Sequence, residues 1–128
     1  MRLTRFATTA ALIAPTVIVA PTLAFSHDAK TGANGGPLAH AGSYHVELVS
    51  QGTTLQVYVR DHDDKAVTTD GYKGVAIFTV SGKAQRIPLT PGGENKLMGT
   101  SPVELPKEPK GAVQITTPTG STLQAKFN

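Results

Sequence analysis

Apolar and polar residues alternate in short runs from Ser43 to the end of the chain, and turn-forming residues separate the runs. Residues 44–48 place apolar side chains at every second position, and residues 55–59 do the same after Gln51-Gly52. A period of two is the pattern of half-buried strands, and nothing after Ser43 shows a convincing helical period. We therefore predict an all-β fold, an antiparallel β-sandwich (Ig-like) of about seven short strands.

The rest of the chain continues this pattern. The run from Gly74 to Val80 is nearly all apolar, so we expect it to be central in the sheet or buried on both sides. Less regular runs predict the remaining strands, the first of them short, at residues 66–69, 85–89, 95–100, 113–117 and 123–127.

The first hairpin has a predicted register. If Gln51-Gly52 is a two-residue turn, Ser50 pairs with Thr53. All the apolar residues of both strands then share one face, whereas a slip of one residue would scatter them. The opposite, polar face carries two cross-strand pairs, Glu47 with Gln56 and His45 with Tyr58.

Extending this register brings His40 to the same end of the hairpin as the polar turn of residues 61–64. Imidazole and carboxylate groups together suit a borderline divalent metal, copper(II) or zinc. The predicted ligands are His40, His62 and one of Asp61 or Asp63.

Strict strand alternation would send His40 and His62 to opposite sides, so a shared ion needs irregular backbone at Ala41-Gly42 or in the turn. The alternative is that these are solvated polar residues at a hairpin end. His45 is either a further metal ligand or a stacking partner of Tyr58, with Glu47 beside it as an outer group.

The first 26 residues have a basic start, an apolar stretch and small residues at the end, as in a cleavable secretory signal peptide. Cleavage after Ala24-Phe25-Ser26 would expose His27, whose amino group and ring could chelate copper only if it is the new terminus. We therefore divide the chain into a signal peptide (1–26), a flexible Gly/Ala-rich arm (27–42) and a β-sandwich domain (43–128). The signal peptide predicts that the mature protein is located in the periplasm.

Charge and composition narrow the classes of function. Without Arg2 and Arg5 the 12 basic residues fall to 10 against 9 acidic ones, so the mature chain is nearly neutral. It has no basic stripe for nucleic acid and no amphipathic segment for a membrane, so we expect neither partner and no embedding of the mature form. Since the chain has no cysteine, disulfides and thiolate metal sites are excluded.

Residues 35–49 combine a glycine-rich lead, a histidine and a Tyr-x-Val-Glu strand, and residues 55–67 form a second strand that ends in an acidic turn. Together with the proline-glycine turn within residues 87–97, this arrangement resembles small periplasmic proteins and a segment of heavy-metal efflux adaptor (membrane-fusion) proteins. In those adaptors two glycines typically follow the histidine, whereas Ala41-Gly42 follows His40 here. The resemblance implies a periplasmic β domain that binds or buffers metal, with an envelope efflux component as a partner.

These observations favour a soluble periplasmic metal-binding or metal-handling protein associated with heavy-metal efflux or resistance. An enzyme is not expected, because the chain has no nucleophile-elbow motif and no selected pair of carboxylates. The competing hypothesis is a metal-independent structural or interaction module that binds another envelope protein through a sheet edge or the proline-containing loop of residues 101–110.

Overall fold

The computed structural model describes residues 31–128, so the predicted signal peptide and His27 lie outside the described residues. Within that range the chain forms eight strands and no helix. They are β1 (Leu38–Ala41), β2 (Tyr44–Gln51), β3 (Thr54–Arg60), β4 (Lys73–Val80), β5 (Lys83–Pro91), β6 (Lys96–Thr100), β7 (Lys110–Thr116) and β8 (Thr122–Phe127).

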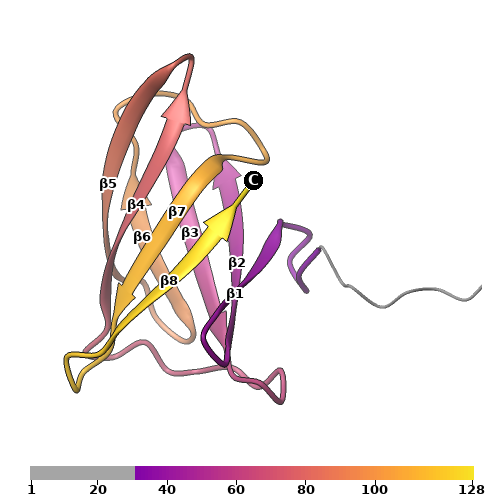
Figure 1. The fold of residues 1–128 in the computed structure, drawn as a ribbon, viewed down its shortest axis with the longest axis vertical. Helices are drawn as coiled ribbons and strands as arrows, with labels where there is room; N and C mark the ends of the chain where they lie inside the picture. Colours follow the sequence, from indigo (N-terminus) through magenta and orange to yellow (C-terminus); the bar gives the residue numbers. More distant parts are fainter. Residues whose placement is uncertain (1–30) are drawn as a thin grey trace, which may run out of the picture.

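The strands form one antiparallel sheet in the order β1-β2-β3-β6-β5-β4-β7-β8. The sheet curls until β1 lies beside β8, so it is nearly closed into a barrel (Figure 1). Strand β5 joins the two halves, because it pairs with β4 over most of its length and reaches β6 only at Thr90 and Pro91. The predicted all-β, antiparallel fold is confirmed; the structure has eight strands in a single curled sheet where about seven in a sandwich were expected.

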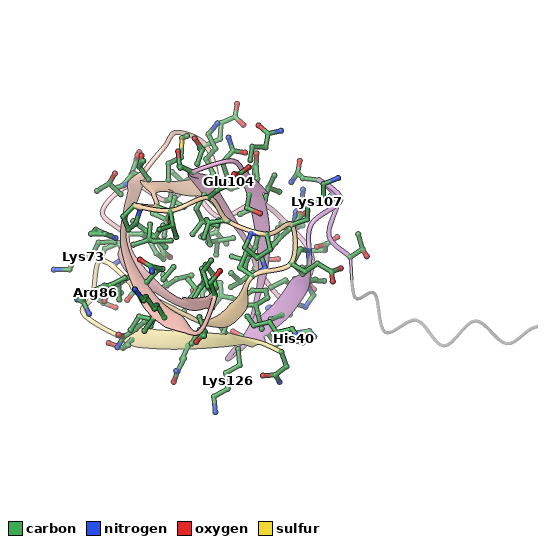
Figure 2. The ribbon with its side chains drawn as sticks, turned by 90° about the horizontal axis from the view of Figure 1, so that it is seen from above. His40, Lys73, Arg86, Glu104, Lys107 and Lys126 are labelled. Carbon is green, nitrogen blue, oxygen red and sulfur yellow. The ribbon has the colours of Figure 1, made fainter. Side chains whose placement is uncertain are left out.

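The barrel interior is filled by apolar side chains from alternate positions of the strands (Figure 2). The short strand β1 contributes only alanines to this core. The largest fully buried side chains include Phe78, Leu48, Leu55, Ile87 and Leu97. Strand β4 lies between β5 and β7, as its apolar run predicted. It is buried on one side only, since Ile77 on its outer side is 44% exposed.

The register of the first hairpin differs from the predicted one. Gln51 pairs with Thr54, so Gly52 and Thr53 form the loop, and Gly52 takes a φ of 59° that favours glycine. Moving the loop by one residue shifts the pairing by two, which leaves every side chain on its predicted face. On the polar face the cross-strand partners of His45 and Glu47 differ from the predicted ones: His45 lies opposite Arg60, and Glu47 lies opposite Tyr58.

Two element boundaries also differ. Residues 66–69 do not form a strand; Ala66 makes a single bridge to Arg60. The strand domain begins before residue 43, because β1 forms within the predicted arm and pairs with β2. The inward-facing residues of β1 are alanines, including the fully buried Ala41, and such small side chains gave no hydrophobic pattern to read.

The segment before β1 is held against the outside of the barrel by a buried carboxylate. Glu47 is only 2% exposed although its side chain points away from the apolar interior. Its Oε2 accepts hydrogen bonds from the backbone N–H groups of Asn34 and Gly36, both at 2.9 Å, and its Oε1 accepts one from Asn34 Nδ2 at 3.1 Å. Several donors to one carboxylate replace the water that burial removes.

The same segment can pass this closely because two of its residues lack side chains. A Cβ on Gly32 would lie 2.2 Å from Glu47 Cδ, and a Cβ on Gly36 would lie 1.7 Å from the carbonyl oxygen of Leu48. Gly32 and Gly36 of the predicted arm therefore allow close packing onto β2.

Replacing Glu47 with glutamine should destabilise the protein. Glutamine keeps one of the two acceptor oxygens and replaces the other with an N–H₂ group. That group then faces either the two backbone N–H donors at Oε2 or the Asn34 side-chain N–H₂ at Oε1. We expect E47Q to lower the free energy of unfolding in urea by about 2 kcal/mol. The control E104Q removes an exposed carboxylate and should change it by less than about 0.5 kcal/mol. Equal, small effects of the two substitutions would contradict the role assigned to Glu47.

Candidate functional site: a histidine pair on the outer face of the barrel

The polar side chains of the first three strands gather on the outer face of the barrel. Ala41, Val46 and Val59 point into the core, so strand alternation puts His40, His45 and Arg60 outside. The pairing sets His40 opposite His45 and His45 opposite Arg60. Three nitrogen-bearing side chains therefore lie in one row across β1, β2 and β3.

The two histidines of this row are in contact. Their ring centroids are 4.7 Å apart and the ring planes meet at 85°, an edge-to-face arrangement. The tight turn at Gly42-Ser43 creates the pair, because it folds β1 directly back onto β2. Gly42 takes a φ of 59° in this turn, a conformation that other residues adopt only with strain.

The acidic turn after β3 brings a carboxylate to this pair. Asp61 Oδ1 accepts the backbone N–H groups of Asp63 and Lys65, each at 2.9 Å, which folds the turn tightly. Arg60 Nη1 donates to the carbonyl oxygen of Asp64 at 3.1 Å and holds the turn against β3. As a result Asp64 Oδ1 lies 3.7 Å from His45 Nδ1.

The backbone donors at Asp61 also act on its ionisation. The N–H of Lys65, foremost, and that of Asp63 stabilise the charged carboxylate and lower the pKa of Asp61 below its ordinary value of 3.8, although desolvation opposes them. Asp61 is therefore a negatively charged brace for the turn, and its Oδ1 already has two hydrogen-bond donors.

His62 is placed differently from His40 and His45. Its Nε2 lies 3.3 Å from Oδ2 of its neighbour Asp63, and both side chains are well exposed, at 71% and 62%. This is a local pair within the turn, distinct from the contact of His45 with Asp64.

The predicted ligands are thus distributed over two places. His40 lies with His45, and His62 lies with Asp63, while Asp61 braces the turn between them. Residues 31–128 hold no group of three or more histidine, aspartate and glutamate side chains already arranged around one point. Sequence reasoning missed Asp64, whose approach to His45 depends on the turn conformation and on the two-residue shift in register.

A pocket of about 270 Å³ opens beside this cluster. It is lined by His45 and Glu47 of β2, by Arg60 of β3 and by Asp64 of the turn that follows. Leu38 and residues 31–33 complete the wall, so the segment held by Glu47 covers part of the outer face. Figure 1 shows this segment outside the barrel beside β1 and β2.

Comparisons of the chain with protein-family models, with curated proteins and with solved structures gave no match. In the part of the chain that the structure describes, no helix is long and apolar enough to span a membrane.

The pKa of Asp61 makes the turn sensitive to acid. A carboxyl whose pKa is lower in the folded than in the unfolded state stabilises the fold above the unfolded value and loses that contribution as the pH falls through the folded value. We expect an NMR titration to place the pKa of Asp61 below 3.8.

Urea unfolding curves at several pH values provide the second measurement. Asp61→Ala should be less stable than the native chain at pH 6, and the two should converge at the acid end. The control Asp70→Ala changes an exposed aspartate of another turn and should keep the native acid dependence. A pKa of Asp61 at or above its ordinary value of 3.8 would contradict the role of Asp61 in the turn.

Proposed function

We propose that this protein binds a divalent metal ion, copper(II) or zinc, through His40, His45 and Asp64. The observation that carries the proposal is the edge-to-face contact of the two imidazoles, which come from neighbouring strands and have a carboxylate beside them. Imidazole and carboxylate are common ligands of both ions.

The distances suit such an ion after small side-chain movements. Metal bonds to imidazole nitrogen and to carboxylate oxygen are about 2.0–2.2 Å long. Two such bonds span the 3.7 Å between His45 Nδ1 and Asp64 Oδ1. Asp64 is 69% exposed, so its side chain is free to move closer. His40 is exposed as well, and a rotation of its ring would supply the third ligand without any change in β1.

The ligand types select among metals. The chain has no cysteine, and the soft ligands that favour copper(I) are not part of this cluster. Copper(II) and zinc accept two imidazoles and a carboxylate and keep positions open for another ligand. We therefore favour these two ions.

The setting of this activity is proposed from the sequence. The leader-like residues 1–26 favour the periplasm, and the resemblance of residues 35–100 to part of the heavy-metal efflux adaptors favours metal handling in efflux or resistance. A protein without enzymatic activity that holds copper(II) or zinc at its surface would serve as a buffer or carrier there.

Metal titration of histidine variants tests the site. All variants should carry His27→Ala, which removes the predicted terminal copper ligand. We expect His40→Ala and His45→Ala each to weaken binding of copper(II) or zinc by at least about tenfold in calorimetry, because each removes a ligand. The control His62→Ala should bind as tightly as its parent.

The outcomes separate the site from the function. If His62→Ala weakens binding and the other two variants do not, the ligands are those of the turn and the assignment to the histidine pair is wrong. If the parent protein binds neither ion more tightly than about 10 μM, metal binding itself is contradicted, and the competing hypothesis of a metal-independent interaction module gains support.

A further inference from the structure

The pocket beside the histidine pair contains an arginine that has no carboxylate partner among residues 31–128. Arg60 Nη1 donates only to a backbone oxygen, that of Asp64. Arg60 Nε is buried and has no hydrogen-bond partner among residues 31–128. A guanidinium has five donors and is well suited to a carboxylate, which it binds through two parallel hydrogen bonds.

The acidic groups that line the pocket do not neutralise Arg60 in this way. The Glu47 carboxylate is occupied by Asn34 and Gly36. The Asp64 carboxylate approaches the ring nitrogen of His45, with Oδ1 at 3.7 Å from Nδ1. The described part of the chain thus contains no ion pair between Arg60 and a carboxylate.

Metal binding would change the charge of this pocket. Arg60 and a divalent cation carry three positive charges, and Glu47 and Asp64 carry two negative ones, so the loaded pocket has a net positive charge. Two imidazoles and one carboxylate also leave at least one coordination position open on copper(II) or zinc. Both features call for an anionic ligand from outside the protein.

We propose that the site binds its metal together with a small dicarboxylate or hydroxycarboxylate. One carboxylate of this ligand takes the open position on the metal, and the other pairs with Arg60. This inference rests on the proposed metal site and names what that site carries, namely a metal–carboxylate complex in place of a bare ion.

The size of the pocket agrees with a small ligand. Its volume of about 270 Å³ is below the roughly 300–1,000 Å³ of pockets that take drug-sized molecules. Residues 31–33 cover it from outside, and Leu38 provides an apolar wall for the carbon chain between the two carboxylates. Glu47 holds this cover in place, so a bound ligand would contact a preformed cavity.

Malonate is a suitable probe, with acetate as the matched monocarboxylate. We expect NMR titration of the zinc-loaded full chain to show malonate binding that shifts the amide signals of Gly32 and Ala33. The protein without zinc should bind malonate at least about tenfold more weakly, and acetate should bind the zinc-loaded protein at least about tenfold more weakly than malonate does.

Variants of arginine identify the second contact. Arg60→Gln should reduce the affinity of the zinc-loaded protein for malonate to its affinity for acetate. Arg60→Lys should reduce the malonate affinity only partly, because lysine keeps the positive charge but cannot form the two parallel hydrogen bonds of a guanidinium. The control Arg86→Gln removes an exposed arginine of β5 and should have no effect. Since each variant is compared through its ratio of malonate to acetate affinity, a change in its zinc affinity does not affect the result.

The outcomes distinguish failure of the proposed carboxylate ligand from failure of the proposed metal site. If zinc binds and malonate binds no better than acetate, the proposed carboxylate ligand is wrong and the metal site stands. An unchanged ratio in Arg60→Gln would equally contradict the role of Arg60. If zinc does not bind, the proposed function fails first. Should Arg60→Gln not fold, the ratio of malonate to acetate affinity in Arg60→Lys tests the proposal, because malonate can also chelate zinc through both carboxylates without the arginine.

Discussion

The buried carboxylate of Glu47 is the constraint on which the outer face of this barrel depends. A carboxylate withdrawn from water without a cationic partner is costly unless donors surround it. Here backbone and side-chain N–H groups of Asn34 and Gly36 surround it, and they can do so only because the chain before β1 folds back over β2. One side chain thereby holds the entry to β1 and the cover of the pocket.

The arrangement of the histidines follows from this entry and from strand alternation. With the apolar residues of β1, β2 and β3 directed into the barrel, the polar residues of these strands form rows outside it. His40, His45 and Arg60 occupy one such row. The Asp61-braced turn adds Asp64 at its end. The resulting cluster places two imidazoles, a carboxylate and a guanidinium within one small area.

The sequence predicted the faces of the strands better than their partners. Period-two alternation assigned Val46, Leu48 and Val57 to the core correctly, because burial imposes that pattern. The register error of two residues leaves the alternation unchanged, so hydrophobicity could not reveal it. The loop consists of Gly52 and Thr53 in place of the predicted Gln51 and Gly52, and that difference is a matter of local backbone geometry. Strand β1 was not predicted, because its inward-facing alanines are too small to give a clear hydrophobic pattern. Its pairing with β2 is what brings the two histidines together.

We expect Glu47, by holding the segment before β1, to keep His40 and His45 in the arrangement that is proposed to bind a metal. The most direct measurement is the copper(II) affinity of E47Q in the His27→Ala background, made where hydrogen exchange shows β2 and β3 still folded and residues 34–36 released. We predict that the affinity falls by about tenfold. A released segment with unchanged copper(II) affinity would contradict the account.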